Sequence, residues 1–290
     1  MVKVIAYHAL AAGPTLTVLG AVHGNERCGA EAIGRLVADI DAGTVKLERG
    51  TVQLVPVTNP RAYAEGVRFV ERNLNRHLYP KAERVHYEDH LDPILCGVLD
   101  KTDVLLDLHS YAAQGGPFIF LGGHNPAEIA YARALGVSDF VCGWAEAFGS
   151  VDAGLESQGT TEYARSKGAL AVTLECGNHT NPDAPGTGYR NILLAMAHLG
   201  MTEVWRSEIA LRPTEQRCVR MENVYRREKG AEFVKPWRHF DAVAKGEPIA
   251  TLAGGGILAA PEDGFLILPN GNSPFGVEWF YFGTKTEFPA

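Results

Sequence analysis

The sequence has few cysteines, and no two of them stand at the Cys-x-x-Cys spacing. The five cysteines, an odd number, are scattered along 290 residues. Disulfide frameworks and thiolate zinc sites both need paired or closely spaced cysteines, so neither organises this fold. Widely spaced free thiols are typical of a reducing compartment, and we therefore expect a cytoplasmic protein.

Long apolar runs and an excess of positive charge are also missing. The N-terminal apolar stretch is too short for a signal peptide, and no later run approaches a membrane-spanning length. The formal net charge is -7, whereas nucleic acids and anionic membranes attract positively charged surfaces. We therefore expect neither a nucleic acid nor a membrane as a partner. Association into a homo-oligomer stays open.

What is present is the composition of an ordinary globular protein. Hydrophobic residues make up 46% of the chain and charged residues 21%, so the chain can bury a large core. Short apolar runs alternate with segments of helical periodicity, which predicts an α/β fold with a mixed sheet flanked by helices. The predicted strands are Thr15–Val22, Thr51–Val57, Val104–His109, Phe118–Leu121 and Leu170–Glu175, and the predicted helices are Glu31–Asp41, Leu91–Leu99, Pro126–Ala134, Thr160–Lys167 and Tyr189–Leu199.

The sequence pattern changes after about Arg212. The helical periods fade, and Gly-rich turns separate short β-like runs. We therefore predict a catalytic domain over residues 1–211 and a small all-β domain over residues 212–290. The spacing of its runs resembles the barrel-sandwich hairpins of biotinyl and lipoyl domains. No lysine stands at a recognisable attachment turn, so this domain is interpreted as structural or as a lid.

The most informative stretch lies where a predicted buried strand gives way to a predicted helix. It reads His23-Gly24-Asn25-Glu26, and α/β proteins place functional groups at such strand ends. In a tight turn, with Gly24 giving the backbone freedom, an imidazole and a carboxylate three residues apart can converge on one zinc ion. The same pattern also fits a polar turn in which Glu26 favours the helix N-terminus.

A third ligand for the same ion stands at the end of another predicted strand. A lone histidine there is more often structural, so His109 gains its meaning from His23 and Glu26 at an equivalent sheet edge. Asp107 shares a strand face with His109, either beside the metal site or as a solvated carboxylate. Two histidines and one carboxylate leave a coordination place for water, so the pattern predicts one catalytic Zn2+ per chain.

Two further stretches carry charged groups suited to catalysis. Residues 59–76 alternate arginines with carboxylates, which fits a salt-bridged surface segment or a site that binds a substrate carboxylate through guanidinium forks. Glu175 ends a predicted buried strand, where an ionisable group is costly unless it is bound, paired or exposed in a cleft. It is a candidate general base, with helix capping or a salt bridge as the alternative.

Other polar and aromatic residues are set aside. His86 and His90 are four residues apart but lack the His-Glu-x-x-His order, so we interpret them as surface histidines. Tyr281 is interpreted as an aromatic packing residue rather than as a catalytic tyrosine. His179 follows Glu175 in a loop whose direction the sequence does not define.

Four of these blocks occur in one order along most of residues 15–200. They are His23-Gly-Asn-Glu26, Arg68 with Asn75-Arg76, Asp-Leu-His109 and Leu-Glu175-Cys-Gly. In this order they resemble the succinylglutamate desuccinylase/aspartoacylase family, a branch of the zinc-carboxypeptidase-like hydrolases, whose architecture also includes a trailing β-domain. The resemblance implies zinc ligation by His23, Glu26 and His109, water activation by Glu175, polarisation of the scissile carbonyl by Arg68, and binding of the substrate carboxylate by Asn75 and Arg76.

Three functions compete on this basis. The leading hypothesis is a zinc-dependent amidohydrolase that removes a small acyl group from an N-acyl amino acid, its small-molecule partner. The alternative is a zinc carboxypeptidase that acts on short peptides, although a β-domain over the cleft would favour small substrates. A catalytically silent zinc-binding protein is disfavoured, because a structural zinc normally has four protein ligands and needs neither Glu175 nor Arg68.

Overall fold

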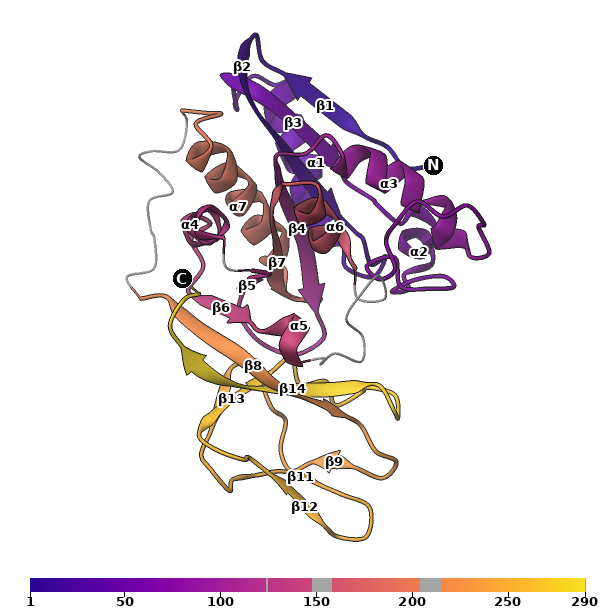
Figure 1. Cartoon of the computed structure of the whole chain (residues 1–290), viewed down its shortest axis with the longest axis vertical. Coiled ribbons are helices and arrows are strands. Elements are labelled where there is room, and N and C mark those ends of the chain that lie inside the picture. Colours follow the sequence, from indigo (N-terminus) through magenta and orange to yellow (C-terminus); the bar gives the residue numbers. More distant parts are fainter. Residues whose placement is uncertain (124, 148–157, 204–214, 290) are drawn as a thin grey trace.

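The computed structural model describes residues 1–123, 125–147, 158–203 and 215–289, in which strands and helices alternate along most of the chain (Figure 1). The strands are β1 (Ile5–His8), β2 (Ala11–Gly20), β3 (Arg49–Val55), β4 (Val104–Tyr111), β5 (Phe118–Phe120), β6 (Asp139–Cys142), β7 (Leu170–Asn178), β8 (Arg217–Arg226), β9 (Glu232–Phe233), β10 (Asp241–Val243), β11 (Pro248–Thr251), β12 (Ile257–Ala259), β13 (Gly264–Ile267) and β14 (Glu278–Thr286). The helices are α1 (Cys28–Asp41), α2 (Pro60–Glu65), the 3-10 helix η1 (Tyr87–His90), α3 (Asp92–Leu99), α4 (Pro126–Ala134), α5 (Trp144–Ala147), α6 (Thr160–Ser166) and α7 (Ala184–His198).

The described residues form an eleven-stranded mixed sheet in the order β1-β3-β2-β4-β7-β5-β6-β8-β14-β13-β10. Strands β3, β2, β4 and β7 are parallel, whereas β5 runs antiparallel to β7. The predicted mixed sheet flanked by helices is therefore confirmed. Because β2, β4 and β7 are parallel neighbours, their carboxyl ends lie side by side at one edge, where α/β proteins build their sites.

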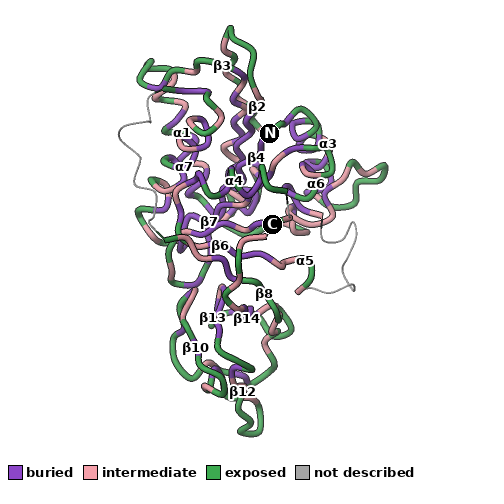
Figure 2. The backbone as a smooth tube through the Cα atoms, turned by 60° about the vertical axis from the view of Figure 1, so that its left-hand side comes forward, coloured by how far each residue is buried: buried purple, intermediate pink, exposed green. Residues whose placement is uncertain are grey.

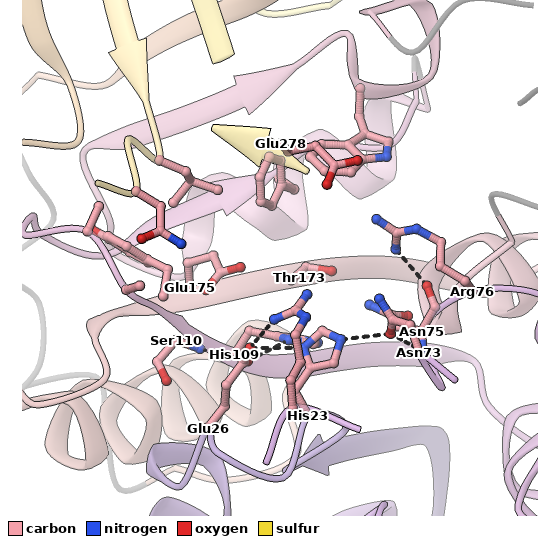
Figure 3. A pocket seen from close by; sticks show the side chains of 18 of the residues that line it. His23, Glu26, Asn73, Asn75, Arg76, His109, Ser110, Thr173, Glu175 and Glu278 are labelled. Carbon is pink, nitrogen blue, oxygen red and sulfur yellow. Dashed lines mark hydrogen bonds and ion pairs between the residues drawn. The ribbon is translucent and has the colours of Figure 1, made fainter. Parts of the chain in front are cut away.

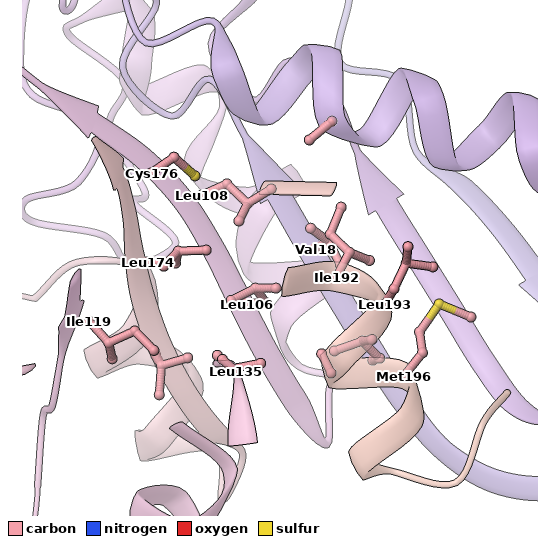
Figure 4. Close-up of a cluster of buried hydrophobic side chains, with 14 of the residues drawn as sticks. Val18, Leu106, Leu108, Ile119, Leu135, Leu174, Cys176, Ile192, Leu193 and Met196 are labelled. Carbon is pink, nitrogen blue, oxygen red and sulfur yellow. The ribbon is translucent and has the colours of Figure 1, made fainter. Parts of the chain in front are cut away.

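Two hydrophobic cores hold the helices against this sheet. On one face, α1, α4 and α7 pack over Leu106 and Leu108 of β4 (Figure 4). On the other face, α3 and α6 pack over Leu105. Since side chains alternate along a strand, Asp107 and His109 point to the face of Leu105. The tube in Figure 2 shows buried residues running along these central strands.

Each predicted element corresponds to a strand or helix of the structure, and the differences lie at the ends, as in α7, which begins five residues before the predicted Tyr189. The helix Pro126–Ala134 is reproduced without a shift, and α1 begins three residues before the predicted Glu31. Strand β7 continues past Glu175 to Asn178. The edge strand β1 and the short strand β6 escaped prediction, because four residues are too few for a decisive periodicity.

The C-terminal strands continue the main sheet. Strand β8 pairs in parallel with β6, and β14, β13 and β10 follow it in antiparallel order. A separate three-stranded sheet, β12-β11-β9, packs with them around their own core, which includes Trp279 and Phe280. The predicted all-β region is therefore present. The boundary predicted between residues 211 and 212 lies outside the described residues and stays a prediction.

Two further observations concern the cysteines and the helices of the described residues. All five cysteines are buried as free thiols. None of the described helices combines the length and the apolar character that crossing a membrane requires.

Candidate active site

Three buried side chains meet where β2 and β4 end. His23 and Glu26 stand in the turn between β2 and α1, and His109 stands near the end of β4 (Figure 3). Nδ1 of His23 lies 2.9 Å from Oε1 of Glu26, and Nδ1 of His109 lies 2.9 Å from Oε2 of the same carboxylate. One candidate ligand atom from each residue lies within 4.8 Å of the others. The structure therefore brings the three predicted metal ligands together.

Close backbone contacts shape the turn that carries His23 and Glu26. A Cβ atom on Gly24 would lie 2.1 Å from the carbonyl carbon of Ala62, so only glycine fits beside α2. Gly24 does not have a positive φ, whereas Ala21 has a φ of 47°. The expectation that Gly24 supplies conformational freedom is thus wrong, because its role is to allow close packing of two backbone segments.

Two oxygen acceptors set the orientation of the imidazole rings. Nε2 of His23 lies 2.9 Å from Oδ1 of Asn73, which also accepts the N–H of Asn75. Because an amide oxygen only accepts, Nε2 of His23 carries the proton and Nδ1 presents a lone pair to Glu26. Nε2 of His109 lies 2.9 Å from Oδ2 of Asp107 in a bent contact. Asp107 is fully buried, so its interpretation as a solvated carboxylate is wrong.

The charges around the three ligands suit a divalent cation. Burial and the nearby Arg68 lower the pKa of His23 to about 4, so this ring is neutral. Burial by itself would lower the pKa of His109, but Asp107 and Glu26 outweigh it and raise this pKa well above its ordinary value. A proton on His109 therefore compensates the carboxylates, and a metal ion could replace it. Two imidazoles and one carboxylate are also the ligand set of many catalytic zinc sites.

Glu175 lies next to this centre without a partner of its own. It occupies β7 directly opposite His109 in the paired strands and is 8% exposed. Its Oε2 atom has no hydrogen-bond partner in the described residues, where neither a helix cap nor a salt bridge engages the carboxylate. Burial and the charge of Glu26 raise the pKa of Glu175 to about 8. A bound cation would act in the opposite direction, because it favours the ionised carboxylate.

The same cavity is lined by Arg68, Asn75 and Arg76, which differ in the hydrogen bonds that their side chains already make. Nη1 of Arg68 donates to Oε1 of Glu26 at 2.9 Å. Asn75 accepts the N–H of Thr160 through Oδ1 at 2.8 Å, so its amide nitrogen is the group that can donate to a substrate. The guanidinium of Arg76 bonds the backbone oxygen of Asn75 and pairs with no carboxylate of the described residues. Arg76 is thus available to an anion.

The cavity has a volume of about 640 Å³ and is enclosed by two parts of the chain. The candidate ligands and Glu175 line one wall. The C-terminal segment contributes another wall, which includes Tyr281, and so the β-region does lie against the site, as a lid interpretation requires. Its lining residues there are Leu268, Asn270, Ser273, Pro274, Val277, Glu278 and Tyr281.

Several residues at the site were missed or left undefined by sequence reasoning. His179 lines the cavity and bonds Oγ of Ser110 through Nδ1 at 2.8 Å. Asn73, which orients His23, belongs to an irregular loop whose only sequence signal is its density of polar residues. His86 and His90 are exposed, as expected.

Glu88 was also missed, although it holds the loop that carries the arginines. Its buried carboxylate accepts the backbone N–H of Val70 at 2.7 Å, that of Glu71 at 3.2 Å and that of Arg72 at 3.1 Å. It also accepts Nδ2 of Asn59 at 3.1 Å. Four donors on one carboxylate fix the path of the chain between Arg68 and Arg76.

Replacing Glu88 by glutamine should loosen this loop. The amide NH2 would face backbone donors, so at least one buried N–H would lose its acceptor, at a cost of roughly 1–3 kcal/mol. Thermal unfolding at neutral pH should therefore begin at a lower temperature in Glu88→Gln than in the parent. Glu83→Gln, an exposed change nearby, is the matched control. Equal unfolding temperatures for Glu88→Gln and the parent would contradict the role given to Glu88.

The same contacts make the stability of this region depend on pH in the acid range. Burial alone would raise the pKa of Asp89, but the N–H of His86 and the guanidinium of Arg72 outweigh it and lower this pKa to about 2, from an ordinary 3.8. The pKa of Glu88 is likewise lowered, because the effect of its hydrogen-bond donors outweighs that of burial. Both carboxylates thus stabilise the fold above their ordinary pKa and lose that effect as pH falls through their lowered pKa, which for Asp89 is about 2. Glu88→Gln should lessen the fall in unfolding temperature over this range.

Fold and site together define a class of protein. A mixed α/β sheet carries two histidines and a carboxylate at its edge, with a free carboxylate and arginines in the adjoining cavity, as in metal-dependent hydrolases. Within this class, residues 12–185 match the catalytic domain of succinylglutamate desuccinylase/aspartoacylase. This match covers more than half of the 290 residues, and the chain belongs to that family of amide hydrolases.

Individual relatives agree with this assignment. A probable aspartoacylase from Nostoc sp. is 30% identical over 121 residues, which span 38% of this chain and 40% of that protein. A succinylglutamate desuccinylase from Silicibacter sp. has a similar structure, with a TM-score of 0.79 at 19% identity over 99% of this chain and 89% of the other. A succinylglutamate desuccinylase/aspartoacylase from Rhodobacter sphaeroides gives a TM-score of 0.78 at 20% identity, over 98% and 90%. At these identities the two structures support the fold alone.

Proposed function

We propose that this protein is a zinc-dependent amidohydrolase that removes a small acyl group from an N-acyl amino acid. The observation that carries the proposal is the unpaired, buried carboxylate of Glu175 beside the converging side chains of His23, Glu26 and His109. A structural metal site needs no such carboxylate, and leaving it unpaired is costly. A proton acceptor at the reacting centre explains why it is there.

The chain's own residues divide the chemistry among them. A zinc ion held by His23, Glu26 and His109 would supply a Lewis acid, which lowers the pKa of water from about 15.7 to about 7. Glu175 would take the proton of the attacking water on its free Oε2 and pass it to the leaving nitrogen. Arg68 would donate to the carbonyl oxygen as negative charge develops there, through N–H groups that Glu26 does not use.

Arg76 would hold the carboxylate of the amino-acid part of the substrate. Its guanidinium is largely removed from water, which lowers its pKa, and it has no carboxylate partner in the described residues. An anion bound there would restore the interaction lost on burial. Asn75 can add its amide nitrogen to the same carboxylate. Both residues follow the loop that Glu88 fixes, so their distance from Glu175 is defined by the fold.

The shape of the cavity favours an acyl amino acid over a peptide. The C-terminal segment from Leu268 to Tyr281 lines one side of a cavity of about 640 Å³, a volume that suits a small molecule. A screen of acetyl-, formyl- and succinyl-amino acids beside dipeptides tests this choice. We expect hydrolysis of one acyl series and little of the dipeptides. The reverse preference would indicate a carboxypeptidase, and no hydrolysis of either class would favour a silent metal-binding protein.

The free buried cysteines support a cytoplasmic setting for this reaction.

Replacing Arg76 by lysine should weaken substrate binding more than it slows the chemical step. Lysine keeps the charge but loses the two-point fork, and a bound carboxylate is held in the ground state as well as in the transition state. We expect KM to rise about tenfold or more while kcat changes less. Steady-state kinetics measure this, with Arg84→Lys, an exposed change, as the control. A variant with an unchanged KM would exclude Arg76 as the carboxylate anchor.

A further inference from the structure

The cavity contains one guanidinium that is free to bind a substrate anion. Three arginines line it in the described residues. Arg68 is bonded to Glu26, and Arg165 makes two bonds from Nε to the carboxylate of Glu128, at 2.9 and 3.1 Å. Arg76 alone among them has no carboxylate partner in the described residues. This count matches a substrate with one carboxylate, because a second one would find no further guanidinium that is without a carboxylate partner.

Opposite Arg76, the cavity presents a carboxylate. Glu278 stands at the start of β14, and its carboxylate points into the cavity from the wall that faces Arg76 (Figure 3). Among the described residues, the carboxylate of Glu278 forms an ion pair with Arg226, whose Nη2 lies 3.4 Å from Oε1. The side chain of Arg226 is 52% exposed. Such exposed pairs contribute little and exchange readily. Glu278 therefore keeps its capacity to accept strong hydrogen bonds.

Two aromatic rings that line the same cavity also favour a positively charged group of the substrate. The guanidinium of Arg76 lies 5.6 Å from the ring centre of Trp144. The ring centres of Trp144 and Tyr281 are 5.5 Å apart. Ring faces attract cations because their quadrupoles are negative there. Trp144 and Tyr281 line the cavity together with Glu278, so a positive group on the substrate would lie among aromatic and carboxylate groups.

We propose that the cavity selects N-acyl derivatives of a basic amino acid, with the carboxylate bound by Arg76 and the side-chain ammonium bound by Glu278. This inference rests on the proposed function, since it assigns the substrate class of the same site. An acidic amino acid would bring its second carboxylate towards Glu278, where like charges repel and no free guanidinium compensates. A basic one places opposite charges on both walls.

The test compares substrates of nearly equal shape in the acyl series that the parent hydrolyses. In the acetyl series these are Nα-acetyl-ornithine, Nα-acetyl-norleucine, in which a methyl replaces the ammonium, and Nα-acetyl-glutamate. We expect the parent to have its highest kcat/KM on the ornithine derivative and its lowest on the glutamate derivative. In Glu278→Gln, the ratio of ornithine to norleucine kcat/KM should fall about tenfold, as for the loss of one charge-assisted hydrogen bond.

Glu222→Gln provides the matched control, because Glu222 lies on the neighbouring strand β8, is exposed and does not line the cavity. Its substrate ratio should equal that of the parent. An unchanged ratio in Glu278→Gln, or a parent that prefers the glutamate derivative, would overturn the inference while hydrolysis itself still supports the amidohydrolase. A parent that hydrolyses no acyl amino acid would overturn both proposals.

Discussion

Glu175→Gln is expected to lower kcat by roughly 10²–10⁴-fold, the range attributed to general acid–base catalysis. Glutamine has nearly the shape of glutamate and keeps one acceptor oxygen, but it cannot take up a proton at neutral pH. Since Oε2 of Glu175 has no protein partner, the change breaks no hydrogen bond of that atom in the described residues. Folding should therefore survive, and the loss should appear in turnover rather than in stability.

Two measurements on Glu175→Gln and one control variant separate the possible causes of inactivity. Metal content should equal that of the parent, because Glu175 is not among the converging ligand atoms. The thermal unfolding temperature should not decrease, because neutralising a buried carboxylate removes a desolvation cost. Glu31→Gln, an exposed change on α1, should leave turnover unchanged. If Glu175→Gln kept metal and near-parental turnover, the proposed proton transfer would be wrong.

The geometry of the candidate metal centre could be predicted because it depends on two strand ends. Gly20 of β2 pairs with Leu108 of β4. The residues that follow Gly20 therefore lie close to the residues that follow Leu108. Glu175 is placed by the same rule, since β7 pairs with β4 and puts it opposite His109. Parallel pairing of buried strands thus converts a sequence order into a site.

The polar loop between α2 and α3 shows where prediction from the sequence ends. Its arginines suggested either surface salt bridges or anion binding, and the structure contains a part-buried ion pair beside an arginine that no carboxylate of the described residues engages. Arg72 pairs with the buried Asp89, whereas Arg76 points to the cavity without a carboxylate partner in the described residues. What separates them is the position of Glu88, which no periodic pattern indicates, because it stabilises backbone amides in an irregular segment.

The C-terminal strands illustrate a second limit. Short β-like runs after about residue 212 were recognisable, but the pairing of β8 with β6 was not, because β6 is only four residues long. That pairing ties the C-terminal segment to the main sheet and thereby brings Glu278 and Tyr281 to the cavity. Side chains that such a segment brings to a cavity are found only when long-range strand order is known.

His109→Ala should lose the metal and with it nearly all activity. The substitution removes one of three candidate ligands and also leaves Asp107 and Glu26 as buried carboxylates without their common partner. Metal analysis of the purified protein should find about one zinc per chain in the parent and little in His109→Ala. Chelation should inactivate the parent, and added zinc should restore it.

Thermal unfolding gives a second, activity-free view of the same centre. A ligand that binds only the folded state stabilises it, by about 2.7 kcal/mol when its free concentration is a hundred times Kd. Zinc should therefore raise the unfolding temperature of the chelated parent but not that of His109→Ala. His90→Ala, at an exposed position of the rival histidine pair, should respond to zinc as the parent does. A chelated parent that is fully active without metal would exclude zinc from the reaction, and zinc stabilisation lost in His90→Ala but kept in His109→Ala would place the metal at the other pair.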